Sequence, residues 1–422
     1  MIFHITNRCG HRPGAYSIFI SAMMLITAVL NIVSWNSKAF SDWYREHIFV
    51  MWGPLYGIIT SKTDRSVGEI MLGVAVILVL LFIVAVCILA TRTLIKRVCI
   101  IYIRLFVAIL MTVALIQTLN CFVLYHTSTF EEQYLNEMLK EKGNRQYTIE
   151  ELGQLRDLIV KRANELAPLM PRDKIGNIVF DEDMAGIAVD SMKTLGEDYA
   201  GLSGYYGRPK ALYTSNFFSQ QYIMGYYFPF SMEANYNDVM YIANIPATMC
   251  HELAHTKGYI SEDEANLIGF LACIRSDEDF FKYSGYLMVL GYVNNDLIDS
   301  IKMDVAAGYG LYVDSPDEIN RVSLEAAGVD VDEYNDRIQT LYDAHVRISD
   351  EVIYDSVFLT KEAWDKVEDK AVLDTETVHA ASDAFINTNL KANGVSQGDA
   401  IYSEVVALLM DYYVYNIEEE LQ

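Results

Sequence analysis

The chain has 422 residues, 52% of them apolar, a formal net charge of −24 and a positive mean hydropathy of +0.16. A chain this acidic is not expected to bind nucleic acid, because such binding needs a basic surface that neutralises phosphates. Its apolar content is high for a water-soluble protein.

Three long apolar runs near the N-terminus explain this excess. They cover approximately residues 15–35, 67–91 and 98–124, and each is long enough to cross a hydrocarbon core of about 30 Å. The first run could be read as a signal peptide. It lacks a small-x-small cleavage site and two more runs follow, so we interpret it as an uncleaved anchor. Residues 1–125 are therefore predicted to be a membrane region with three transmembrane helices.

Charge divides the chain at the same place. The membrane region holds 10 Lys and Arg against 4 Asp and Glu, a net of +6, whereas residues 126–422 hold 22 against 52, a net of −30. Residues 126–422 are enough for one sizeable core, and we treat them as a single domain. A domain this acidic should be repelled by nucleic acid and by anionic lipid head groups.

The basic residues of the membrane region indicate its orientation. Arg92, Lys96 and Arg97 lie between the second and third spans, and Arg8 and Arg12 precede the first. The positive-inside rule places these residues in the cytoplasm. We therefore expect a multi-pass protein of the cytoplasmic membrane, with its N-terminus inside and its domain on the extracellular or periplasmic side.

The loop between the first two spans should lie on the same side as the domain. It carries the aromatic residues Trp43, Tyr44, Trp52 and Tyr56. Such residues favour the level of the lipid head groups. This loop is therefore predicted to lie in the membrane interface.

The first half of the domain contains both helix and strand patterns. Thr148 and Glu151 have the spacing of a capping box that opens a helix to about Leu169, and a second helix is predicted over 181–195. Aromatic-rich stretches bounded by Gly and Pro predict strands at 210–213 and 222–227, with a third possible at 235–242. After Ser276 the chain reads as mainly helical.

His251-Glu252-Leu253-Ala254-His255 is an HExxH motif. Residues four apart share one face of a helix, so both imidazoles can reach one Zn²⁺. Glu252 is poorly placed as a ligand but can take a proton from a water held by the metal. The alternative is a helix with two surface histidines. Pro246 suits the first turn of this helix, and Gly258 is a natural stop.

Ser261 opens a second helix, predicted from Glu262 to about Arg275, which should supply the third ligand. Glu262 heads a stripe of small residues that would let the two helices approach closely; the stripe comprises Ala265, Asn266, Gly269, Ala272 and Cys273. Glu264 instead heads an apolar face and has capping-box spacing with Ser261. The two carboxylates are about 200° apart on the helix, so only one should face the zinc. We favour Glu262 as the ligand and Glu264 as the cap, with the reverse left open.

The stretch Glu262-Asp263-Glu264-Ala265-Asn266 resembles the E-x-x-A-D/N helix of several membrane-associated zinc peptidases, which include the membrane-bound prenyl-protein and heat-shock proteases. In that helix the first Glu binds zinc, which implies Glu262 here. The polar residue four positions on supports a ligand, which implies Asn266.

A closer resemblance is to an uncharacterised bacterial family of three-span membrane proteins regarded as zinc metallopeptidases. It is carried by residues 225–235 followed by 251–266, by 42–69, and by 390–406. Met232 departs from the pattern, because a small residue is expected there. The resemblance implies a fold and a chemistry but no substrate.

Other residues near these segments are weaker candidates. Glu233 is either an exposed loop acid or a group near the site. Tyr402, and Tyr226 or Tyr227, could stabilise an oxyanion, although packing roles are more common for tyrosine. Cys250 and Cys273 are expected to be buried free thiols rather than a disulfide, and they are not spaced as zinc ligands.

These patterns predict an α+β protein: three transmembrane helices followed by a mostly helical zincin-like domain of the gluzincin type with a small β-sheet. One Zn²⁺ would be held by His251, His255 and Glu262, and Glu252 would be the catalytic base for hydrolysis of a peptide or protein substrate. Two alternatives remain. One is a non-catalytic membrane sensor or scaffold that keeps the zinc fold, and the other is an amidase acting on a cell-wall component.

Overall fold

The computed structural model describes residues 14–90, 95–135, 147–392 and 404–413. Within these residues, three helices are long and apolar enough to cross a membrane: α1 (Ala15–Asn36), α4 (Val67–Ala90), and α5 (Lys96–Gln117) with its continuation to His126. α5 packs against both α1 and α4. The outward-facing side chains of all three are apolar and exposed, as a lipid-facing surface requires. The prediction of three spans in a multi-pass membrane protein is confirmed.

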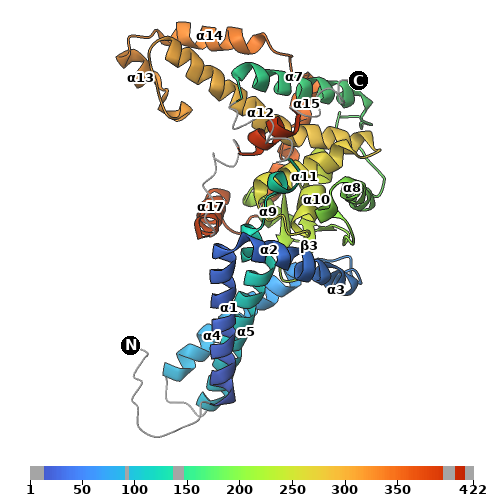
Figure 1. The fold of residues 1–422 in the computed structure, drawn as a ribbon, viewed down its shortest axis with the longest axis vertical. Coiled ribbons are helices and arrows are strands. Elements are labelled where there is room, and N and C mark those ends of the chain that lie inside the picture. Colours follow the sequence, from blue (N-terminus) through green and yellow to red (C-terminus); the bar gives the residue numbers. More distant parts are fainter. Residues whose placement is uncertain (1–13, 91–94, 136–146, 393–403, 414–422) are drawn as a thin grey trace.

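The segment between the first two spans is helical and lies at the junction of the bundle and the domain (Figure 1). It comprises α2 (Lys38–Tyr44), a π-helical turn η1 (Arg45–Phe49) and α3 (Val50–Thr60). The side chains of Tyr44 and Phe49 are buried in a small apolar core with the end of the third span and with residues of the domain. This junction core therefore contains side chains from both parts of the chain.

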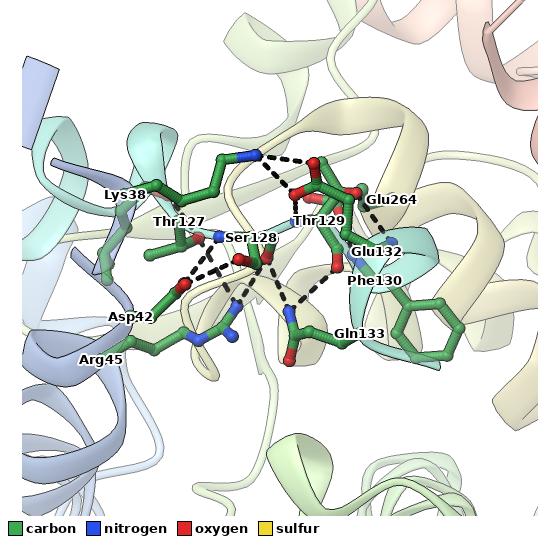
Figure 2. Close-up of polar contacts among 11 residues, drawn as sticks. Lys38, Asp42, Arg45, Thr127, Ser128, Thr129, Phe130, Glu132, Gln133 and Glu264 are labelled. Atoms are coloured by element: carbon green, nitrogen blue, oxygen red, sulfur yellow. Dashed lines mark hydrogen bonds and ion pairs between the residues drawn. The ribbon is translucent and has the colours of Figure 1, made fainter. Parts of the chain in front are cut away.

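Polar contacts also join the two parts (Figure 2). The Asp42 carboxylate accepts hydrogen bonds from the backbone N–H and the hydroxyl of Ser128, both at 2.6 Å, and Lys38 pairs with Glu132 at 2.6 Å. Arg45 donates to the Ser128 carbonyl at 3.3 Å. Helix α2 thus holds the segment that leads from the third span into the domain.

The domain is built around a helical core. Helix α7 (Ile149–Leu166) starts with the predicted capping box, in which Thr148 and Glu151 bond reciprocally. It packs along the long helix α12 (Asp279–Gly308), and α8 (Met184–Asp198) packs on α10 (Ile245–His255) and α11 (Glu262–Ile274). Short turns η5 (Ala167–Leu169), η6 (Ala200–Leu202) and η7 (Ile242–Asn244) connect these elements.

The described residues form one three-stranded sheet. Its strands are β1 (Lys210–Ala211), β2 (Gly225–Phe228) and β3 (Glu233–Tyr236), in the order β1-β3-β2. β1 and β3 are parallel, whereas β2 and β3 are antiparallel with Gly225 opposite Tyr236. All three strands are shorter than predicted, and β3 starts two residues earlier. β2 is an edge strand next to α10, and α9 (Ser215–Gln220) links β1 to β2.

The C-terminal part is helical, as predicted. Its elements are η8 (Pro316–Glu318), α13 (Arg321–Ala326), α14 (Val331–Asp343), α15 (Asp350–Asp355), α16 (Lys361–Lys370), α17 (Thr375–Ala392) and a helix over 404–413. The fully buried carboxylate of Asp355 anchors this part: Arg172 donates two hydrogen bonds to it, at 3.0 and 2.6 Å, and the hydroxyls of Tyr241 and Tyr283 donate one each. The α+β class predicted from the sequence is confirmed.

Candidate metal centre

The HExxH residues lie on α10 (Ile245–His255), as the spacing predicts. Pro246 is in the first turn, where its missing N–H leaves no helical hydrogen bond unmade. The helix ends after His255, and Gly258 turns the chain with a positive φ of 89°. This turn sends the chain back along α10 as α11 (Glu262–Ile274).

Three potential ligand atoms converge where α10 and α11 meet. The Nε2 atoms of His251 and His255 are 3.1 Å apart, and the Glu262 carboxylate lies 3.2 Å from the first and 3.8 Å from the second. Ligands about 2.0–2.1 Å from a tetrahedral zinc are separated by about 3.3 Å. Among the described residues, these three side chains form a group that could hold a metal ion.

The far side of each imidazole is fixed by a carbonyl oxygen. Nδ1 of His251 is 2.9 Å from Oδ1 of Asn266, and Nδ1 of His255 is 2.7 Å from the Tyr259 carbonyl. A carbonyl only accepts, so in the neutral imidazole the proton is on Nδ1 and a lone pair is on Nε2. Two lone pairs that face each other at this distance repel, and either a proton on one Nε2 or a metal ion between the two removes the repulsion. The donor set therefore fits zinc, including the supporting position predicted for Asn266.

The charges of the site are strongly coupled. Burial lowers the pKa of His251, but the Glu262 carboxylate outweighs this effect and raises it to about 8. Burial lowers the pKa of His255 to about 4, against the opposing pull of Glu262. Burial would raise the pKa of Glu262, but the two imidazoles hold it at about 2. Glu262 is thus ionised, and its side chain keeps 47% of its accessible surface, so the open side of the site reaches solvent.

Glu252 is buried beside this group. Its Oε2 has no hydrogen-bond partner among the described residues, and burial raises its pKa to about 8. Gly225 of β2 lies so close that a Cβ there would be 2.4 Å from Oε1 of Glu252. A buried carboxylate without a full set of hydrogen-bond partners destabilises the fold, and a catalytic role is one reason why such a group is retained. Its position between the histidines and an edge strand suits a proton-transfer group.

The stripe of small residues has the packing role that its spacing predicts. Gly269 of α11 faces the backbone of His251: a Cβ there would lie 3.0 Å from the His251 nitrogen and 3.2 Å from its Cα. Cys250 and Cys273 are buried free thiols, as expected. The close approach of the two helices brings Glu262 and Asn266 to the histidines.

The predicted capping box of α11 is wrong. Ser261 occupies the N-cap position, but its side chain makes no capping hydrogen bond, and its hydroxyl instead contacts Asp263. Glu264 is buried and accepts a hydrogen bond from the backbone N–H of Phe130, in the segment held by α2 (Figure 2). Glu264 therefore ties α11 to the junction and does not cap its own helix.

The remaining candidates lie in different surroundings. Glu233 is buried and not on an exposed loop: it pairs with Lys210 at 2.7 Å, and it accepts hydrogen bonds from Ser231 and from the backbone N–H of Gly68 in the second span. Tyr227 is buried with its ring 6.1 Å from that of His255. Tyr226 is partly exposed on the other face of β2. Tyr402 lies outside the described residues.

Met232 stands where the family resemblance predicts a small residue, and its packing accounts for the larger side chain. Its φ is 53°, in the left-handed region that favours glycine. Its side chain is buried in the junction core with Tyr227 and Ile260. Packing across the junction therefore compensates for an unfavourable backbone conformation.

Sequence reasoning missed the contribution of the membrane region to the site. Leu124, at the end of the third span, and Arg45 contact Gly258, in the turn that separates the two helices of the site. Cys121 and Tyr125, one helical turn apart, lie near the Glu262 carboxylate. No local spacing signals these contacts, because the residues are more than a hundred positions apart in the chain.

A comparison with family models matches residues 44–322, about two-thirds of the chain, to a family described as "Protein of unknown function (DUF3810)". No curated protein and no solved structure matches the chain. The chain belongs to the DUF3810 family, and the match runs from the juxtamembrane segment through the second and third spans to both helices of the site.

Proposed function

We propose that this chain is a membrane-anchored, zinc-dependent metallopeptidase that holds one Zn²⁺ with His251, His255 and Glu262. One observation carries the proposal: two imidazoles whose Nδ1 atoms contact carbonyl oxygens bring their Nε2 atoms to within 3.1 Å of each other, beside a carboxylate. Two His and one carboxylate leave a fourth tetrahedral position open, which distinguishes catalytic from structural zinc sites.

A zinc ion at this position supplies Lewis acidity toward a carbonyl oxygen and toward water. Asn266 and the Tyr259 carbonyl keep the imidazoles in the tautomer that presents Nε2. Glu252 takes the proton from the attacking water and returns it to the leaving amine. Its free Oε2 and its raised pKa suit both transfers.

The edge strand β2 gives a place for the substrate backbone. β2 is hydrogen-bonded to β3 on one side, and Gly225 brings the strand against Glu252. An extended peptide can pair with such an edge through main-chain hydrogen bonds. Only glycine allows this approach of the strand to the carboxylate, so a side chain at this position would displace the proton-transfer group.

We place the domain on the extracellular or periplasmic side of the cytoplasmic membrane. The support is the cluster of Arg92, Lys96 and Arg97 between the second and third spans, set against the acidic domain.

The test uses the full-length protein in lipid nanodiscs, because the core of the junction includes residues of both parts. We expect about one Zn²⁺ per chain, severe loss in His251→Ala and His255→Ala, and full occupancy in His379→Ala, a control at a partly exposed histidine outside the site. Glu252→Gln should keep the metal and lose hydrolysis of a peptide library. Full zinc occupancy in the His251/His255 double variant would refute the site.

The same experiment separates the alternatives. A chain that binds zinc but hydrolyses neither peptides nor cell-wall amides would be a sensor or scaffold. Hydrolysis of cell-wall amides alone, abolished in Glu252→Gln, would indicate an amidase. Peptide hydrolysis that depends on Glu252 supports the proposal.

A further inference from the structure

Helix α3 has two faces of opposite character. Its inner face is docked on the domain: Gly57 lies against the ring of Tyr205, and the Thr60 carbonyl accepts a hydrogen bond from Lys210 at 2.7 Å. Its outer face is purely aliphatic and exposed, by 49% at Val50, 59% at Met51, 51% at Leu55, 60% at Ile58 and 62% at Ile59. The helix contains no charged residue.

A face of this kind is unfavourable in water. Each exposed aliphatic side chain forgoes about 1 kcal/mol or more of burial free energy. Exposed apolar patches of this kind mark an interaction with a membrane or a partner. The position of α3 in the chain distinguishes a membrane from a protein partner.

Three features of the chain indicate a lipid partner. α3 is followed within a few residues by the second span, which starts at Val67, so the bilayer surface is within reach of the helix. It lies across the direction of the bundle at its domain-facing end (Figure 1). It has 11 residues, a length of about 16 Å, too short to cross a core of about 30 Å.

Aromatic and charged residues complete the pattern. Trp52 and Tyr56 are partly buried between the two faces, and Trp43 is half exposed just before the helix. Lys62 and Arg65 follow it and are exposed. Aromatic rings and long basic side chains favour the head-group level, above the acyl chains.

We propose that α3 is an in-plane membrane helix, whose face of Val50, Met51, Leu55, Ile58 and Ile59 is embedded in the lipid leaflet on the domain's side. This proposal does not depend on the proposed function. It has a consequence for the site, because Tyr44 and Phe49, which precede α3, share a buried core with Tyr227 and Ile260. The Tyr227 ring in turn lies close to that of His255. The candidate metal centre would then lie on the side of the domain that faces the bilayer.

The test is photo-crosslinking of the full-length protein in phosphatidylcholine–phosphatidylglycerol nanodiscs. A photoreactive phenylalanine analogue replaces Ile58 or Met51, whose exposed side chains can be exchanged without loss of core packing. Leu80, exposed in the middle of the second span, is the positive control, and Tyr312, exposed in the C-terminal part, is the negative control. Adducts are identified by mass spectrometry.

We expect lipid adducts at Ile58 and Met51 with yields within about threefold of that at Leu80, and none at Tyr312. Lipid yields at Ile58 and Met51 as low as at Tyr312 would overturn the proposal. Adducts to a second copy of the chain in place of lipid would also overturn it, because the face would then be a protein interface.

Discussion

Gly269→Ala tests whether the spacing of α10 and α11 sets the geometry of the metal centre. The added Cβ would lie 3.0 and 3.2 Å from backbone atoms of His251, which cannot rotate away. Ordinary carbon contacts need about 3.5–4.0 Å, so the helices must separate by about 0.5 Å. Overpacking of this kind costs about 1–3 kcal/mol, and the better helix propensity of Ala recovers about 0.5–1 kcal/mol. The net loss of unfolding free energy should be between about 0 and 2.5 kcal/mol.

The same displacement should weaken metal binding. It moves Glu262 and Asn266 away from His251 together, and disturbance of such supporting contacts typically lowers metal affinity about 10–100-fold. Zinc affinity is measured by competition with a chromogenic chelator, and stability by thermal unfolding with and without metal. Gly291→Ala is the matched control, because nothing among the described residues lies within 4 Å of its added Cβ, and it should be stabilising. A Gly269→Ala protein that behaves like the control would refute the reasoning.

Three other predictions follow from single contacts. Glu262→Gln should weaken zinc binding strongly in a metal titration. Glu264→Gln should keep the metal and lower the unfolding free energy by at most about 1 kcal/mol, because a Gln oxygen can still accept the hydrogen bond from the Phe130 backbone N–H. Equal zinc affinities of the two variants would contradict the ligand assignment. Asp355→Ala should lower the unfolding free energy by about 3 kcal/mol in denaturant titrations, because it leaves Arg172 without its partner. Asp350→Ala removes an exposed ion pair with Arg347 and should change the unfolding free energy by less than about 1 kcal/mol. Similar losses in the Asp355 and Asp350 variants would argue against the buried network. A reporter at the C-terminus should be external and one between the second and third spans cytoplasmic; a cytoplasmic C-terminal signal would reverse the orientation.

Features that depend on local periodicity could be predicted from the sequence. The three spans rest on runs of about 18 or more consecutive apolar residues, and the capping box at Thr148 and the HExxH helix rest on residues three or four positions apart. The convergence of Glu262 with both histidines was predicted from its position at the head of the stripe of small residues. Such spacings fix which side chains share a helix face. The stripe of small residues that includes Gly269 also indicated which face of α11 would pack against α10.

Features that depend on long-range partners could not be predicted. Glu264 has correct capping-box spacing, but it bonds to Phe130, which lies 134 residues earlier in the chain. Glu233 is held by Lys210 and by Gly68 in the second span. In both cases a tertiary contact satisfies a buried carboxylate that the local pattern would leave in a loop or at a helix end, and nothing in the adjacent sequence specifies that partner.

The docking of the domain on its spans determines which peptide bonds the site could reach. A catalytic domain on a flexible tether samples a volume that widens with tether length, and it meets substrates at many distances from the bilayer. Here four side chains form hydrogen bonds across the junction: Lys38, Asp42, Glu69 and Glu233. The domain is therefore held at a fixed distance from the spans. If the site hydrolyses peptides, its selectivity would depend on the distance of a peptide bond from the membrane surface as well as on the neighbouring side chains.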